Sequence, residues 1–237
     1  MSVPDDVLNV VMTTYDEGSG NRAKLARRTL ESLVKNLSYT HVHYIISDDS
    51  TIENHQKHID FITEPLAGFS FETLVHNRRL VGHSKNVSLK KAFEISPYVL
   101  LTEDDWEMQQ PLDFTAYMSV LQDYPTAGMI RLGYLGGDHL TAVLTAYGYH
   151  TFWRIVQGSD VYCYSGQVSL RHERFYQATG FHDENTEAGD EELRFCKRYN
   201  GTPNAPDILY PGNLGVTLNS GLFKNIGFEC STNTVSS

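Results

Sequence analysis

The chain has 237 residues, of which 41% are hydrophobic and 20% are charged, and its formal net charge is −10. The length suits one large domain or two small ones with a substantial core, and the acidic balance argues against a non-specific nucleic-acid coat or a general membrane binder, since both favour basic surfaces. A local basic cluster is still present at Arg22, Lys24, Arg27 and Arg28.

The first 110 residues alternate between strand-like and helix-like patterns. Short apolar runs rich in branched residues predict buried strands at residues 7–13, 42–47, 71–75 and 99–101. Apolar residues at helical spacing, with good helix formers between them, predict helices at residues 22–36, 53–63 and 84–93. This alternation predicts an α/β fold with a mostly parallel sheet and helices on its faces.

The rest of the chain has a different character. Helices are expected at residues 114–121, 173–179 and 191–199, a strand at 128–132, and loops with short mixed strands over 133–169. The tail, residues 213–237, is rich in Asn, Gly, Ser and Thr, and its last residues are expected to be mobile. We find no internal repeat or low-complexity linker, and predict one domain, residues 1–237, with a nucleotide-binding half at about 1–110 and an acceptor and catalytic half at about 111–237.

The cysteines and the N-terminus bear on the compartment. Cys163, Cys196 and Cys230 are odd in number, widely spaced and without a CxxC pair, which favours reduced thiols over a disulfide frame or a zinc site. The N-terminus lacks a basic region followed by a long apolar segment, and no stretch approaches the roughly 18 apolar residues of a membrane span. We therefore expect a cytoplasmic protein.

An apolar run that ends in three consecutive acids is the most informative segment. Glu103, Asp104 and Asp105 follow directly on the strand predicted at residues 99–101. Adjacent carboxylates repel one another, and Mg²⁺ and similar hard cations are commonly held by one or two carboxylates together with a substrate's phosphates. The segment therefore suggests a metal-bridged phosphate site, and the alternative is a solvated acidic turn.

Two other strand ends carry polar motifs of the same kind. In open α/β sheets, ligands bind beyond the carboxyl ends of the strands. That rule places residues 13–16, 47–51 and 103–106, with the sequences TTYD, SDDST and EDDW, around one crevice.

These motifs together resemble the GT-A glycosyltransferases, particularly family 2. The segments that carry the resemblance are VMTTYD, SDDST, VGHSKNVSL, the EDD strand end with its metal motif, GQVSLRHERFYQATGFHDE and GDEELRFCKR. They occur in the family's order between about residues 7 and 198. The resemblance implies a Rossmann-like nucleotide-binding half, a mixed acceptor half and a sugar transferase that uses Mn²⁺ or Mg²⁺.

The resemblance also implies roles on the donor side. Thr13 and Tyr15 would line the base pocket, and Asp49 would accept a hydrogen bond from the base. Lys85, which stands where the family usually has Arg, would approach the donor's phosphates. Asp104 would contact the ribose or its neighbourhood, and Asp105 would bind the metal.

The acceptor side needs a carboxylate that deprotonates the acceptor hydroxyl. Asp190 matches the family's usual base, but the acid that normally precedes it is Gly189 here, so Glu191 stays a candidate for the same role. Many GT-A enzymes add a C-terminal His to the metal, and the matching position here is Asn225.

We therefore predict a hexosyltransferase that moves a sugar from a nucleotide-sugar, a UDP-sugar in the first instance, to an acceptor hydroxyl with inversion. The acceptor is left open between a saccharide, a protein, a small molecule and a modified DNA base. One rival is a nucleotidyltransferase, although residues 15–24 lack the G-x-G-x-R-x-x-P-x-x-K pattern of those enzymes. The other is a non-catalytic nucleotide- or sugar-binding module. For Asp49 and for residues 190–192, a plain helix-capping or helix-dipole role is the alternative.

Overall fold

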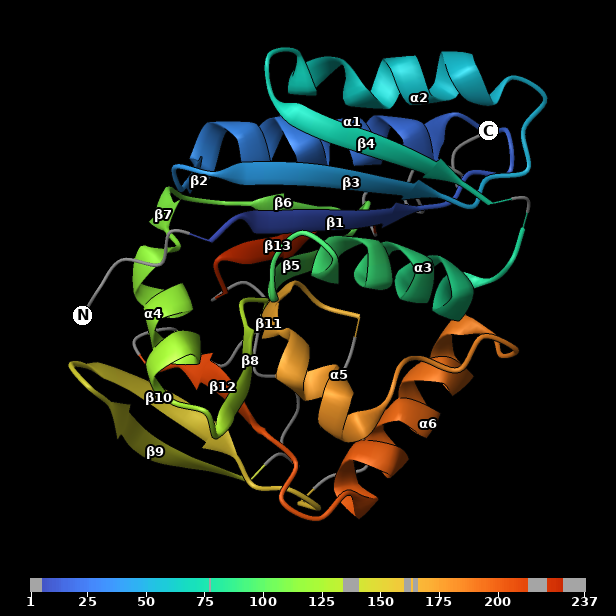
Figure 1. Ribbon diagram of the computed structural model, residues 1–237. Helices are drawn as coiled ribbons and strands as arrows, with labels where there is room; N and C mark the ends of the chain where they lie inside the picture. The colour runs from blue at the N-terminus through green and yellow to red at the C-terminus, as the bar shows by residue number, and fades with distance from the viewer. Residues whose placement is uncertain are drawn as a thin grey trace, which may run out of the picture.

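A nine-stranded sheet forms the centre of the computed structural model, which describes residues 6–76, 78–133, 141–159, 163, 166–212 and 221–227 (Figure 1). The strand order is β4-β3-β1-β5-β11-β8-β12-β10-β9, so the sheet runs without a break through both halves of the chain. The order also places β1 between β3 and β5, which brings the three acidic or polar strand ends next to one another.

The N-terminal half of the sheet is parallel. Its strands are β1 (Leu8–Thr14), β3 (Val42–Asp48), β4 (Ser70–Val75) and β5 (Tyr98–Glu103). Thr13 of β1 pairs in register with Ser47 on one side and Glu103 on the other. The carboxyl ends of β1, β3 and β5 therefore lie at one level of the sheet edge.

The C-terminal half of the sheet is mixed. Its strands are β8 (Ala127–Arg131), β9 (Ala142–Tyr147), β10 (His150–Ile155), β11 (Ser169–His172) and β12 (Asp207–Pro211). β11 joins the halves because it runs antiparallel to both β5 and β8. Two small sheets pair β2 (Leu37–Ser38) with β7 (Leu112–Asp113) and β6 (Trp106–Met108) with β13 (Phe223–Asn225).

Helices cover both faces of the sheet (Figure 1). They are α1 (Asn21–Asn36), α2 (His55–Thr63) with a following 3₁₀ turn at Glu64–Leu66, α3 (Val81–Phe93), α4 (Thr115–Asp123), α5 (Glu173–Thr179) and α6 (Ala188–Gly201). The alternation of side chains along β1 divides the core: Val10 and Met12 pack with α1, α2 and α4, and Val11 packs with α3, α5 and α6.

The predicted α/β fold with a parallel first half and a mixed second half is confirmed. The predicted helices and strands up to residue 132 are present with ends shifted by one to three residues, the largest shift being α3, which begins at Val81 rather than 84. The prediction omitted β2, β6, β7, β12 and β13, four of which have only two or three residues and therefore no periodicity to detect.

Two expectations about the chain's environment can be compared with the structure. Among the described residues, no helix is both long and apolar enough to cross a lipid bilayer. Cys163 and Cys196 are buried free thiols, and Cys230, with most of the tail at 213–237, lies outside the described residues.

Candidate active site

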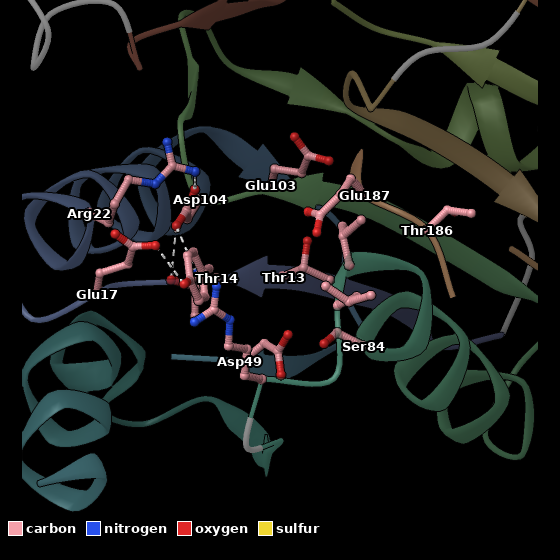
Figure 2. A pocket seen from close by; sticks show the side chains of 14 residues that line it. Thr13, Thr14, Glu17, Arg22, Asp49, Ser84, Glu103, Asp104, Thr186 and Glu187 are labelled. Atoms are coloured by element: carbon pink, nitrogen blue, oxygen red, sulfur yellow. Dashed lines mark hydrogen bonds and ion pairs between the residues drawn. The ribbon is translucent and has the colours of Figure 1, made fainter. Parts of the chain in front are cut away.

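A cavity of about 320 Å³ opens at the carboxyl ends of β1, β3 and β5 (Figure 2). Fourteen residues line it: Thr13, Thr14, Tyr15, Glu17, Arg22, Asp49, Arg78, Leu80, Val81, Ser84, Glu103, Asp104, Thr186 and Glu187. Four residues that the sequence analysis assigned to the donor are among them, namely Thr13, Tyr15, Asp49 and Asp104. The other four predicted site residues, Lys85, Asp105, Asp190 and Glu191, are not part of this lining.

Asp104 lies at the floor of the cavity, in the turn that links β5 to β6. Its carboxylate is buried and accepts hydrogen bonds from the Thr14 hydroxyl at 2.9 Å and the Tyr15 amide at 3.3 Å. It also pairs with the guanidinium of Arg22, which Figure 2 shows reaching over it. Burial raises the pKa of Asp104 to about 7, although the Arg22 charge opposes that shift.

Asp105 follows in the same turn but does not line the cavity. One carboxylate oxygen lies 3.2 Å from Arg22, and the other is buried with no hydrogen-bond partner. Burial and the nearby Glu103 charge raise the pKa of Asp105. β13 packs beside this turn, because the Ile226 amide donates to the Asp105 carbonyl at 2.8 Å.

The residues around Asp105 suit a hard divalent cation. The unpartnered carboxylate oxygen is the kind of donor that Mn²⁺ or Mg²⁺ prefers. The amide oxygen of Asn225 is close by, since it and the Arg22-paired oxygen of Asp105 both lie where a Cβ on Gly227 would project. The Asn225 oxygen also accepts a hydrogen bond from the Gly227 amide at 2.9 Å. The described residues form no group of three or more His, Cys, Asp or Glu that could hold a metal alone, so phosphate and water oxygens would have to complete any coordination shell.

Asp49 is fixed on the opposite wall of the cavity, at the end of β3. It accepts a hydrogen bond from the backbone amide of Arg79 at 2.6 Å. The alternative role as a helix cap does not apply, because Asn54 caps α2 by accepting from the Lys57 amide at 3.0 Å. Asp49 therefore ties β3 to the loop before α3, a loop in which Arg78 and Leu80 have positive φ angles of 51° and 73°.

Lys85 is buried behind the cavity rather than exposed within it. Only 1% of the residue is accessible, and its ammonium lies 3.0 Å from Glu103 and 3.6 Å from Glu191. Lys85, which was expected to approach the phosphates, is therefore already paired with two carboxylates in this structure.

The two candidate bases lie in different environments at the start of α6. Asp190 is exposed to solvent, whereas Glu191 is fully buried and hydrogen-bonded to His182. Burial alone would raise the pKa of Glu191, but the His182 contact and the Lys85 charge outweigh it and lower the value to about 2. Glu192 accepts from the Gly166 amide, and burial raises its pKa. Of the two predicted bases, only Asp190 is open to a substrate.

Ten of the fourteen lining residues were not assigned to the site from sequence, among them Arg22, Arg78, Thr186 and Glu187. The two arginines had a usable signal, since Arg22 belongs to the basic cluster in α1 and Arg78, next to Arg79, follows the carboxyl end of β4 by three residues. Nothing in the sequence motifs pointed to Thr186 or Glu187, which reach the cavity because the loop before α6 folds over it.

No protein-family model and no curated protein sequence matches the chain. Solved structures do match. A fragment of TarS from S. aureus in complex with UDP-GlcNAc superposes with a TM-score of 0.62 at 14% identity, over 92% of this chain and 57% of that one. GalNAc-T7 with UDP, GalNAc and Mn²⁺ gives a TM-score of 0.62 at 14% identity, over 86% of this chain and 42% of that one.

A third match is the mannosyltransferase PcManGT from Pyrobaculum calidifontis in complex with GDP-Man and Mn²⁺, with a TM-score of 0.53 at 13% identity, over 87% of this chain and 57% of that one. The chain spans between 35% and 60% of the length of these and the related TarS chains. At such identities the likeness shows the fold alone, and that fold is the one of GT-A glycosyltransferases.

Proposed function

We propose that this protein is a metal-dependent glycosyltransferase that moves a sugar from a UDP-sugar to an acceptor hydroxyl with inversion at the anomeric carbon. The observation that carries the proposal is the cavity at the ends of β1, β3 and β5, where five acids and two arginines line one nucleotide-sized space. Structural neighbours with UDP-GlcNAc, UDP with GalNAc, and GDP-Man support the same chemistry in this fold.

The donor base is assigned to the wall formed by Thr13, Tyr15 and Asp49. A carboxylate only accepts hydrogen bonds, and one oxygen of Asp49 is held by the Arg79 amide, which fixes the direction of the other. That second oxygen suits the imide N–H of uracil, which cytosine lacks. Asp104, buried on the floor, is assigned to the ribose.

The diphosphate is assigned to Arg22 and Arg78, which line the cavity. A guanidinium binds phosphate oxygens through two parallel N–H groups. We assign Lys85 a different role from the one that the resemblance implies: it holds Glu103 and Glu191 in place.

Asp105 and Asn225 would hold the Mn²⁺ or Mg²⁺. When bound, the cation supplies positive charge for the diphosphate that leaves as the sugar is transferred. Asp190 is assigned as the general base that takes the proton of the acceptor hydroxyl, because it is exposed in the first turn of α6, three residues after the cavity-lining Glu187. Glu191, paired with Lys85 and His182, is assigned to positioning α6 rather than to proton transfer.

The test combines nucleotide binding with turnover. A ligand that binds only the folded protein raises its melting temperature, so UDP with Mn²⁺ is expected to stabilise the wild type and a chelator to reduce that effect. Asp105→Asn should lose the metal-dependent part of the shift. Asp190→Asn should keep it and lose the release of UDP from UDP-sugars, whether to water or to an acceptor.

Three outcomes separate the proposal from its rivals. No stabilisation by any nucleotide would remove the donor site. Stabilisation without turnover of any UDP-sugar, in the presence of saccharide, protein and DNA acceptors, would favour the binding module. Stabilisation by nucleoside triphosphates with release of pyrophosphate would favour a nucleotidyltransferase.

A further inference from the structure

Arg22 contacts both acids of the Asp104–Asp105 turn, and Figure 2 shows its guanidinium beside Asp104. One guanidinium nitrogen pairs with Asp104, and the other lies 3.2 Å from Asp105. The negative charge of the two adjacent carboxylates is thus already partly compensated by a side chain of the protein itself. A divalent cation at Asp105 would have to share that carboxylate with the guanidinium or displace it.

The backbone of Arg22 is held in place, whereas its side chain is partly exposed. Asp16 accepts hydrogen bonds from the amides of Gly18 at 2.7 Å, Gly20 at 3.3 Å and Ala23 at 3.1 Å, and so holds the loop that begins α1. The Arg22 side chain is 39% exposed, while those of Asp104 and Asp105 are 1% and 14% exposed. The acids are therefore held in place, and the arginine is the member of the group with room to move.

We propose that Arg22 is a built-in counter-ion that makes metal binding depend on the nucleotide. In the free protein its guanidinium pairs with both Asp104 and Asp105 and so weakens the binding of a divalent cation. When a nucleoside diphosphate enters the cavity, the guanidinium turns to its phosphate oxygens, which it contacts with the same two-pronged geometry. Asp105 is then open to the cation. This inference rests on the proposed function, since it assumes a diphosphate in the cavity.

The coupling must be mutual. If the diphosphate raises the affinity for the cation by some factor, the cation raises the affinity for the diphosphate by the same factor. The wild type is therefore expected to bind Mn²⁺ weakly alone and at least tenfold more tightly with UDP. Removing the guanidinium should raise the affinity for Mn²⁺ alone and reduce that factor.

The experiment is a Mn²⁺ titration followed by electron paramagnetic resonance, in which the signal of free Mn²⁺ falls as the ion binds. It is run with and without UDP on the wild type, Arg22→Gln and Arg22→Lys. Arg28→Gln is the matched control, because Arg28 is on the same helix, 40% exposed, and paired at 2.8 Å with Glu107 near the same turn. Circular dichroism checks that each variant is folded.

Arg22→Gln is expected to bind Mn²⁺ alone about tenfold more tightly than the wild type, Arg22→Lys to fall between them, and Arg28→Gln to match the wild type. Equal Mn²⁺ affinity in the wild type and Arg22→Gln overturns the inference, as does an equal gain in Arg28→Gln, which reflects only the loss of one positive charge. If Arg22→Gln is unfolded, the inference stands or falls on Arg22→Lys by the same comparison. Failure of UDP to bind at all overturns the proposed function separately, since the titration without UDP still reports on Arg22.

Discussion

The two halves of the molecule handle buried charge in different ways. At the strand ends of β1, β3 and β5, the acids face a cavity and their counter-charge is Arg22, a partly exposed side chain. Beneath α3 and α6, the charges of Lys85 and Glu191 are sealed in the interior and neutralise each other. Both arrangements compensate negative charge, but only the first relies on a partly exposed cation that a ligand can reach.

The interior charges continue as a connected network. Glu191 binds His182, whose other ring nitrogen lies 3.1 Å from the Tyr176 hydroxyl, and that hydroxyl accepts a hydrogen bond from Arg171. The backbone of His182 is tied to α3 as well, because Asn86 exchanges two hydrogen bonds with it, each 2.9 Å long. Such a network fixes α6, and with it Asp190, against the donor half. The charged groups of the cavity thus face the space for a ligand, whereas those of the buried network stabilise the fold.

The largest effect is expected for Lys85→Met, which removes one partner of the buried Lys85–Glu191 ion pair. Removing one partner of a buried ion pair leaves the other uncompensated and costs about 3–5 kcal/mol, so urea unfolding should show a loss of that order. Lys91→Met is the control, since the exposed Lys91–Glu94 pair on the same helix should contribute less than about 1 kcal/mol. A Lys85→Met protein of normal stability that binds UDP poorly would instead return Lys85 to the phosphate role.

A smaller effect is expected from pH, through His182. The ring is packed against Glu191 of α6, Tyr176 of α5, Lys85 of α3 and Arg171 of β11, and burial lowers its pKa from the ordinary 6.5 to about 4 even though Glu191 opposes the shift. Between these two values the unfolded chain binds a proton that the folded protein does not, so stability falls as the pH falls from 6.5 to about 4.

The contribution of His182 to the free energy of unfolding should therefore fall by about 3 kcal/mol between pH 7 and pH 4, measured by urea unfolding as the difference between the wild type and His182→Gln. The difference is needed because Asp104, whose pKa is raised to about 7, and His172, whose pKa is lowered to about 4, also change stability in this range, in opposite directions. Glu191, whose pKa of about 2 lies below its ordinary 4.5, adds to the loss only below pH 4.5. The wild type should therefore lose more stability than His182→Gln between pH 7 and pH 4.5, and the control His41→Gln, at an exposed position, should follow the wild type. Equal pH dependence in the wild type and His182→Gln contradicts a buried neutral His182.

The residues that line the cavity were easier to predict from the sequence than the buried ion pair between α3 and α6, and the reason is physical. The carboxyl ends of adjacent parallel strands converge, so Thr13, Asp49 and Asp104 could be placed together once their strands were recognised. The pairing of Lys85 with Glu191 could not be predicted. A charged residue at a helix start is normally solvated, and these two meet only because β11 brings the C-terminal half beside β5.

The position of Arg22 could be predicted from the sequence only in part. The basic cluster in α1 was visible, but nothing local distinguishes Arg22 from Arg27, which pairs with Glu31 on the helix surface at 2.9 Å. The difference arises from packing, because α1 lies beside β6 and the first turn of α1 therefore faces the Asp104–Asp105 turn.

The smallest effects are expected at Asp49 and Asn54, where one substitution should weaken ligand binding and the other should lower stability. Asp49→Asn keeps an oxygen that can accept from the Arg79 amide, so stability should hold, while an amide group replaces the second acceptor assigned to the base. We expect UDP to bind roughly tenfold more weakly, about 1.4 kcal/mol, as measured by calorimetric titration.

Asn54→Ala is the counterpart, and its effect should be the reverse. Asn54 caps α2 through the Lys57 amide and does not line the cavity, so its loss should lower stability by about 1 kcal/mol and leave the affinity for UDP unchanged. If Asp49→Asn lost stability and kept its affinity, Asp49 would belong with the structural charges. The donor pocket would then have to recognise the base through Thr13 and Tyr15 alone, neither of which can select uracil by charge.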